Sequence, residues 1–495
     1  MNAEASHGIV AAGHPLTAEA GARALREGGN AVDAAVAAML MSWVTEPLLT
    51  GPGAGGYMLV AGAGEQPVLL DFFVAAPGHG AAGAQRTPLA PIVVDFGDAR
   101  QTFHVGASSC GAFGTPAGVD EAIRRWGSLD LATLAAPAAA LARDGVVLNA
   151  QQAEVVHLLE AILRSTPAAL DLHAPGGTLL CEGDCFRSPE LGDTIERLGS
   201  EGCEPFYRGD IADAVAATVA EGGGDLTAED LRRYEALARE PLRVVYRGRE
   251  VLTNPPPSAG GILIALALAL LDEVPAPPPL AMIVRAMEQA QSARTPQFVA
   301  GLAEPGFAER LLGSRMGSTT HISVLDADGR TCSVTCTNGE GSGVVVPGTG
   351  IHMNNIMGEA DLNPLGWHTA PPGRRMPSMM SPTVVMRDGE VHVALGSSGS
   401  NRIRSALLQT IVAIVDHGLD AAAAVAAPRV HLEDDVISAE PGAALDELRY
   451  DPYVVQHFRS LNMFFGGVQA VSRDPRTGAM DGAGDPRRGG VAVAA

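Results

Sequence analysis

The chain has 495 residues, 46% of them hydrophobic, which is enough for one very large domain or for two or three ordinary ones. Acidic residues outnumber basic ones by 56 to 34, and the formal charge of -22 opposes binding to nucleic acid or to an anionic membrane. The chain contains no lysine, which excludes pyridoxal phosphate enzymes, P-loop enzymes and protein kinases, because each of these needs a particular lysine.

The N-terminal residues and the longest apolar stretch bear on the cellular location of the protein. Residues 1–7 carry no lysine or arginine and residues 8–12 form only a short apolar run, so neither part of a secretory signal is present. The apolar stretch 262–271 has about half of the roughly 20 residues that a membrane-spanning helix needs. We therefore expect a cytoplasmic protein.

Cys181 and Cys185 have no second pair of Cys or His ligands nearby, and we expect no metal site.

The first part of the chain predicts helices and one hairpin. Thr17 and Asn30 are placed to cap two successive helices. Short apolar runs at 57–60 and 68–72 flank a glycine-rich turn and predict a hairpin. Mostly helical sequence follows over residues 117–237, and a proline-rich turn then leads into the apolar helix described above.

The last third of the chain predicts strands. Residues 320–325 pair naturally with 331–337, and residues 381–387 with 391–395, because an Asp-Gly turn between alternating runs is a strong hairpin signal. A helix is expected over about residues 404–417. Helices first, paired antiparallel strands later and a final helix predict an α+β architecture in which helices pack on stacked sheets.

Two glycine-rich motifs match known signatures only in part. Gly51 to Gly56 has the GxGxxG spacing of a dinucleotide-binding turn, but it lacks a strand before it and a helix after it. Close backbone packing is the favoured interpretation, and a hydride-transfer enzyme is a remote alternative. Gly396 to Ser400 misses the GxSxG pattern of serine hydrolases at its last position. We expect no cofactor.

Ser318-Thr319-Thr320-His321 opens the first predicted hairpin of the last third. A threonine hydroxyl is a poor nucleophile unless a base lies beside it. A threonine at a newly formed N-terminus carries its own base, because its α-amine titrates at about pH 8 in a model peptide. Taken alone, however, these residues are typical of any strand start.

Segments over nearly the whole chain resemble the gamma-glutamyltransferase family, and so many in one order make chance an unlikely explanation. They are Gly28 to Ala35, Gly51 to Gly56, Glu229 to Leu242, Pro255 to Ile262, Thr319 to His321, Pro347 to Ile351, Asn354-Asn355, Met380 to Thr383 and Ala427 to Arg429. The resemblance implies the four-layer helix-sheet-sheet-helix sandwich of N-terminal-nucleophile hydrolases. It also implies one precursor that cuts itself into a helix-rich large subunit, residues 1–318, and a strand-rich small subunit, residues 319–495.

The resemblance further implies the catalytic residues. Thr319 matches the nucleophile, and the resemblance alone favours it over Thr320 as the new N-terminus. Thr337 matches the second threonine whose hydroxyl supports the nucleophile. Gly399 and Ser400 match the two residues whose backbone amides form the oxyanion hole, where the second is glycine in familiar members. A backbone donor survives a change of side chain, so the catalytic set is expected to be complete.

The acyl-binding positions depart from the family. Phe73 stands where the family has the arginine that grips the α-carboxylate of the glutamyl group, and the loss of a two-pronged charge-assisted clamp costs about a hundredfold in affinity or more. Ile356 replaces a polar residue that helps to hold the α-amine, and Met379 replaces one of two adjacent serines. Polar candidates remain at three acyl-binding positions: Asn338, Glu359 and Ser378.

The expected function is an autoprocessed threonine amidohydrolase or acyltransferase that forms an acyl-enzyme and passes the acyl group to water or to an amine. A gamma-glutamyl amide is the family default, whereas Phe73 favours another acyl group, apolar or dicarboxylic, as in related beta-lactam side-chain acylases. The alternative is a non-catalytic relative that serves as a binding or structural protein. The expected partners are a small-molecule amide substrate and the two subunits of one precursor, with a homodimer of that heterodimer as a further option.

Overall fold

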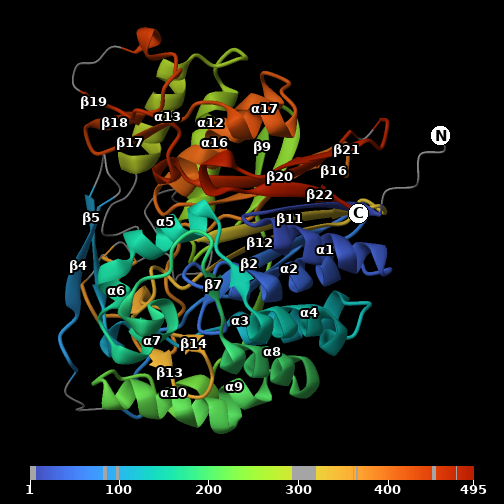
Figure 1. The fold of residues 1–495 in the computed structure, drawn as a ribbon. Helices are drawn as coiled ribbons and strands as arrows, with labels where there is room; N and C mark the ends of the chain where they lie inside the picture. The colour runs from blue at the N-terminus through green and yellow to red at the C-terminus, as the bar shows by residue number, and fades with distance from the viewer. Residues whose placement is uncertain are drawn as a thin grey trace.

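The computed structural model describes residues 7–81, 86–95, 100–292, 319–360, 362–363, 366–448, 453–474 and 476–495. Two antiparallel sheets lie face to face, and helices cover the outer face of each (Figure 1). This is the four-layer α+β sandwich predicted from the sequence, and the prediction is confirmed. No helix in the described part of the chain is both long and apolar enough to cross a membrane.

The first sheet has seven strands in the order β22-β1-β11-β12-β2-β3-β8. The predicted hairpins of residues 57–72 and 320–337 are both confirmed, and they meet where β12 pairs with β2. The strands are β1 (Gly8–Ala12), β2 (Gly55–Ala61), β3 (Val68–Phe72), β8 (Leu237–Arg239), β11 (Thr320–Asp326), β12 (Thr331–Thr337) and β22 (Val491–Ala494).

The second sheet has six strands in the order β21-β20-β16-β15-β10-β9. The predicted hairpin of residues 381–395 is its β15-β16 pair. The strands are β9 (Leu242–Tyr246), β10 (Arg249–Thr253), β15 (Thr383–Arg387), β16 (Glu390–Ser398), β20 (Gly467–Arg473) and β21 (Met480–Ala483). Smaller sheets join β4 (Ala90–Asp95) to β5 (Arg100–Val105), β6 (Val146–Val147) to β7 (Cys185–Phe186), β13 (Val345–Val346) to β14 (Ile351–His352), and β17 (Val430–Glu433) to β18 (Val436–Ala439) and β19 (Val454–His457).

Side-chain alternation along each central strand builds two cores. In β2, Met58 and Val60 pack with the helices on the outer face, whereas Tyr57 and Leu59 pack into the core that the two sheets share. Because both faces of the first sheet are covered, its central strands are apolar on both sides. Polar side chains on the inner face of these strands are therefore exceptions that need a reason.

Helices α1 (Pro15–Arg26) and α2 (Ala31–Thr45) cover the first sheet (Figure 1). Asn30 caps α2 as predicted, and Asp33 completes a capping box with it. The prediction that Thr17 caps α1 is wrong. The cap is His14, three residues earlier, because proline suits the first position of the helix at Pro15 and the His14 side chain accepts the hydrogen bond from the Leu16 amide.

The mostly helical stretch predicted over residues 117–237 is confirmed and continues this layer. Its helices are α3 (Thr115–Trp126), α4 (Leu131–Asp144), α5 (Ala150–Leu158), α6 (Glu160–Leu163), α7 (Pro167–His173), α8 (Pro189–Glu201), α9 (Glu204–Arg208), α10 (Asp210–Glu221) and α11 (Ala228–Arg232). The opposite layer covers the second sheet with α12 (Gly260–Asp272), α13 (Leu280–Ser292), α16 (Arg402–Val415), which is the predicted helix near residue 404, and α17 (Ala421–Ala426).

The segments before and after residue 318 build both sheets together. In the first sheet β11 and β12, from the later segment, lie between β1 and β2, from the earlier one. In the second sheet β15 pairs with β10. The predicted division into subunits at residue 318 therefore does not correspond to two separately folded domains.

If the peptide bond before Thr319 breaks, the two pieces are expected to stay associated, because the inter-strand hydrogen bonds described above are left intact. We expect the cut protein to elute from a sizing column as one species under native conditions and to separate into two pieces in denaturing electrophoresis. Native elution of the 1–318 piece by itself would contradict the shared sheets.

Candidate active site

Thr319 directly precedes β11 at the centre of the first sheet. β11 pairs with β12 so that Thr320 faces Cys336, and continuing this register by one residue sets Thr319 opposite Thr337. Thr319 is 1% exposed, and its hydroxyl has no hydrogen-bond partner among the described residues. A buried hydroxyl without a partner costs about 1 to 3 kcal/mol, so its retention calls for a functional explanation. Ser318, on the other side of the predicted cut, lies outside the described residues.

Thr337 is also buried, and its hydroxyl oxygen accepts a hydrogen bond from the Gly339 amide at 2.7 Å. That bond fixes the side chain and leaves the hydroxyl proton available for donation. The Thr319 hydroxyl is not its partner in this structure, although the two residues are neighbours across the hairpin. The supporting role of Thr337 thus stays a prediction that its position permits.

Gly399 and Ser400 lie at the end of β16, in the facing sheet. β16 passes over β11 at His321, since a Cβ atom on Gly396 would lie 2.1 Å from a carbon of the His321 ring. Thr320 and Ser398 line the same cavity, so the start of β11 and the end of β16 meet there. The amides of Gly399 and Ser400 consequently lie at the same end of the two sheets as Thr319.

The backbone at this end is unusual in two ways. Gly399 and Ser400 have φ angles of 116° and 62°, and the second is a left-handed conformation that a serine rarely adopts. Neither of their backbone N–H groups donates to another group in the part of the chain that the structure describes. An oxyanion hole needs free backbone donors, so the two N–H groups are compatible with the predicted role.

His321 joins the two sheets beneath the predicted nucleophile. Its Nδ1 lies 2.8 Å from the Thr335 hydroxyl and its Nε2 lies 2.9 Å from the Ser323 hydroxyl. The Ser323 hydroxyl in turn donates to the backbone oxygen of Gln469 in the facing sheet at 3.1 Å. Burial lowers the pKa of His321 to about 3, so the ring is neutral at working pH and serves to hold the strands.

The three apolar replacements in the predicted acyl site pack into one core. Phe73, Ile356 and Met379 are all fully buried and belong to the large core that fills the space between the sheets and continues under the helices of the second sheet. The ring of Phe73 stacks on that of Tyr57 with their centroids 5.5 Å apart. The structure thus buries in apolar surroundings three residues that are far apart in the sequence.

Arg375 contacts the backbone of Phe73 and is therefore a candidate to replace the missing arginine. Its guanidinium group is already occupied, because Nη1 donates to the Phe73 backbone oxygen at 2.8 Å and Nη2 donates to the Glu235 backbone oxygen at 2.6 Å. Its Nε lies 3.3 Å from the buried carboxylate of Asp71. Arg375 therefore has a structural role in this arrangement and does not restore the carboxylate clamp.

The predicted polar candidates lie in two places. Both side-chain polar atoms of Asn338 are buried without a partner among the described residues. Glu359 and Asn355 both reach Gly339, where a Cβ atom would lie 2.2 Å from Oε1 of the first and 2.1 Å from Oδ1 of the second. Ser378 lies elsewhere, in the segment before β15, where its backbone oxygen accepts the amides of Ala259 and Gly260 at the start of α12. Its hydroxyl oxygen accepts the Met380 amide at 3.0 Å.

Sequence reasoning missed Glu46 and Arg488, which line the cavity beside Thr320 and Ser398. One signal was available. Glu46 follows the C-terminus of an apolar helix, where the helix dipole disfavours a negative charge, so a carboxyl group there needs another reason. Within the described residues, no group of three or more His, Cys, Asp or Glu side chains could hold a metal ion.

Two stacked antiparallel sheets between helix layers, with a buried threonine at the start of a central strand, define the class of N-terminal-nucleophile hydrolases. The sequence pattern of the gamma-glutamyltranspeptidase family matches residues 17–495, and the chain belongs to this family.

Individual relatives support this family assignment. The chain is similar to the cephalosporin acylase of Bacillus halodurans, with a TM-score of 0.84 and 26% identity over 99% of this chain and 96% of that one. It is 31% identical to the glutathione hydrolase proenzyme of Bacillus subtilis, over 98% of this chain and 91% of the relative. It is also 31% identical to the acylase ACY 1 proenzyme of Pseudomonas sp. V22, over 99% and 94%.

Replacing His321 by glutamine is expected to reduce the loss of stability in acid. The unfolded chain binds a proton at His321 below about pH 6.5, whereas the folded chain does so only near pH 3, so stability falls as the pH falls between these values. Between pH 7 and pH 5 the protonation of His321 in the unfolded chain lowers the free energy of unfolding by about 2 kcal/mol. Urea unfolding of wild type and variant at pH 7 and at pH 5 measures this loss.

The matched control is His417→Gln, because His417 is exposed. Equal pH dependence in wild type and His321→Gln would show that His321 is protonated in the folded protein.

Proposed function

We propose that this protein is an autoprocessed threonine amidohydrolase or acyltransferase whose nucleophile is Thr319. One observation carries the proposal: a buried, unpartnered threonine hydroxyl lies at the start of a central strand, at the end of the sheets where two backbone amides are also free. The relatives named above are proenzymes and acylases, which supports catalysis over a non-catalytic binding role.

In the first step the Thr319 hydroxyl attacks the carbonyl carbon of residue 318. The hydroxyl proton passes to the peptide nitrogen, which leaves as the amine of Thr319, so an amide becomes an ester between residue 318 and the Thr319 oxygen. Water then hydrolyses this ester and releases the carboxylate of residue 318. The product is a threonine whose free amine lies beside its own hydroxyl.

In the second step the amine of Thr319 takes the hydroxyl proton while the oxygen attacks the amide carbon of the substrate. The amides of Gly399 and Ser400 would stabilise the negative charge that forms on the substrate oxygen. The amine of the substrate takes up the proton and leaves, and an acyl ester on Thr319 remains. Water or a second amine then attacks the ester and restores the free hydroxyl.

The acyl group is apolar in this proposal. A gamma-glutamyl group would bring an α-carboxylate and an α-amine against Phe73, Ile356 and Met379, and a buried charge without a partner is strongly unfavourable. Arg375, the nearby cation, is held by Asp71 and by backbone oxygens. A glutathione hydrolase and a cephalosporin acylase are both among the relatives, and the apolar packing favours acylase-like substrates.

The cytoplasmic location and the homodimer of heterodimers stay predictions from the sequence. Fractionation of the native host cells and mass measurement of the native protein test them.

Replacement of Thr319 by alanine is expected to abolish self-cleavage, because no hydroxyl is left to attack the preceding carbonyl. Denaturing electrophoresis should show one uncut chain, and amide turnover should fall by at least about a thousandfold, as for loss of other covalent nucleophiles. Thr320→Ser is the control and should cut normally. Mass spectrometry of the small piece of the wild type should place Thr319 at its N-terminus, and a piece that begins with Thr320 would overturn the assignment.

The apolar acyl site predicts a substrate preference. We expect the wild type to hydrolyse a simple apolar acyl anilide with a kcat/KM about a hundredfold or more above that for gamma-glutamyl anilide, the cost of losing the charged clamp. Met379→Ser should narrow this ratio. Equal rates on the two anilides would show that Phe73 does not define the acyl site.

A further inference from the structure

Helix α2 and strand β11 lie against each other and are tied together at both ends by a carboxyl group. At one end the Ala31 amide donates to Asp326 Oδ2 at 3.0 Å. At the other end the Thr320 hydroxyl donates to Glu46 Oε1, also at 3.0 Å. A helix of 15 residues and a strand of seven both extend over about 20 Å, so each tie meets its partner without bending the chain.

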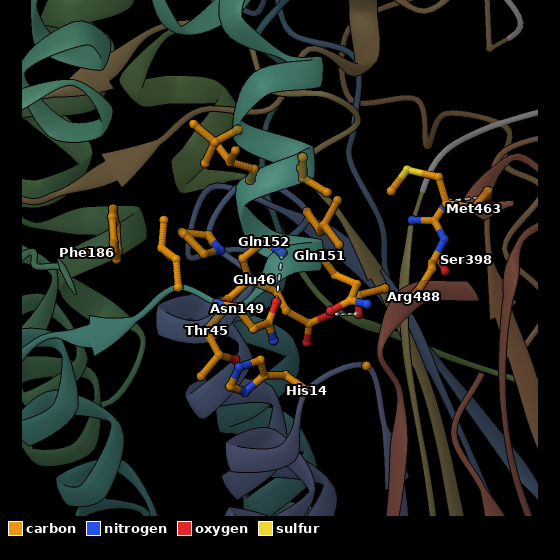
Figure 2. A pocket seen from close by; sticks show the side chains of 18 of the residues that line it. His14, Thr45, Glu46, Asn149, Gln151, Gln152, Phe186, Ser398, Met463 and Arg488 are labelled. Atoms are coloured by element: carbon orange, nitrogen blue, oxygen red, sulfur yellow. Dashed lines mark hydrogen bonds between the residues drawn. The ribbon is translucent and has the colours of Figure 1, made fainter. Parts of the chain in front are cut away.

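The two hydrogen bonds, Ala31 to Asp326 and Thr320 to Glu46, have different surroundings. Asp326 begins the turn of the β11-β12 hairpin, and its other oxygen accepts the Arg330 amide. Glu46 is bonded to the residue that follows Thr319, and it lines a cavity together with Ser398, which precedes the two free amides (Figure 2). Glu46 therefore contacts the part of β11 that carries the predicted nucleophile.

The Glu46 carboxyl group is buried at a site built to hold it. Its second oxygen, Oε2, has no hydrogen-bond partner among the described residues. A Cβ atom on Gly13 would lie 2.5 Å from Oε1, so only glycine fits at this position, just before the His14 cap of α1, while the carboxyl group occupies this place. Leu48, Leu148 and other apolar side chains form much of the cavity wall. An unpartnered carboxyl oxygen in such surroundings is costly, and its retention calls for a role.

The charges that face Glu46 are few. Arg488 lines the same cavity, and its Nη2 donates to the Met463 backbone oxygen at 3.2 Å. Burial raises the pKa of Glu46 to about 7, and the Thr320 hydroxyl, Arg488 and Thr17 oppose this rise. Burial lowers the pKa of His14, in the same cavity, to about 4, so this ring is neutral near pH 7.

We propose that Glu46 is a positioning residue for the nucleophile: by holding the Thr320 hydroxyl from the helix side, it fixes the peptide that joins Thr320 to Thr319 and so aims the Thr319 hydroxyl toward the facing sheet. Side chains alternate along a strand, so a residue held on one face fixes its neighbour on the other. The ionised carboxylate makes a charge-assisted bond, about twice as strong as the bond that the protonated form makes. Self-cleavage therefore slows when Glu46 is protonated. The proposal rests on the function proposed above.

The test follows self-cleavage of freshly made precursor, because no α-amine exists before the cut to add its own pH dependence. The precursor is made by cell-free synthesis, and the cut is timed by denaturing electrophoresis between pH 5.5 and pH 8.5. We expect the wild-type rate to fall as the pH falls through about 7. Glu46→Gln is expected to cut about tenfold more slowly at pH 8 and to lose this pH dependence, because glutamine does not ionise.

Three further variants separate an effect on the position of Thr319 from an effect on the stability of the whole fold. Thr320→Val, which lacks the hydroxyl, is expected to slow self-cleavage as much as Glu46→Gln does. The double variant Glu46→Gln/Thr320→Val is expected to slow self-cleavage no more than either single variant. Thr320→Ser keeps the hydroxyl and should restore the wild-type rate. Asp326→Asn weakens the tie at the far end of the same helix and strand and should change the rate by less than about twofold. Melting temperatures confirm that each variant is folded.

The outcomes are distinct. A wild type that cuts itself while Glu46→Gln cuts at the same rate overturns the role of Glu46 and leaves the proposed function intact. Equal slowing by Glu46→Gln and Asp326→Asn also overturns it, since loosening either end of the strand would then suffice. A wild type that never cuts overturns both proposals.

Discussion

The pairing of β11 with β12, and its attachment to the facing sheet through His321, is the constraint on which the site depends. Two strands from the centre of one sheet present Thr319 and Thr337 side by side. The neutral His321 ring, bonded to Thr335 and Ser323, packs against Gly396 and so fixes how β16 lies across them. Because the free amides of the predicted oxyanion hole follow β16, the spacing between the predicted nucleophile and these amides depends on this buried contact between the sheets. A hydrogen-bonded network in a dry layer is rigid, since every member has a partner and water does not compete.

Several polar groups at this end of the sheets lack such partners. The Thr319 hydroxyl, the Asn338 amide and one oxygen of Glu46 are buried and unpaired among the described residues. Each is costly by itself, and the large apolar cores on both faces of the first sheet offset that cost. The satisfied network around His321 and the unsatisfied groups beside it have different functions. The first holds the strands, and the second are the groups that the proposed reaction and its proposed control would use.

The proposed apolar acyl site would let the same fold act on another substrate. The proposed reaction steps use backbone amides, a hydroxyl and an amine, none of which depends on the residues that hold the acyl group. Phe73, Ile356 and Met379 are the three apolar replacements in the proposed acyl site, and all three are buried in one core. Arg375 is fixed by Asp71 and by the Phe73 backbone, which makes the site apolar without leaving a buried charge unpaired.

The sequence by itself determined the hairpins, most of the helices and the order of elements, because Asp-Gly turns, the Asn30 cap and apolar periodicity are local signals. It failed at the start of α1, where Pro15 and His14 outweighed the Thr17 signal. It also named Thr319, Thr337, Gly399 and Ser400, through a resemblance that runs along the whole chain. Only the tertiary structure decided that Phe73, Ile356 and Met379 share one core, that Arg375 is already occupied and that Glu46 holds Thr320 across 274 positions of the chain. Such contacts depend on how sheets and helices stack, and no local pattern of residues records that arrangement.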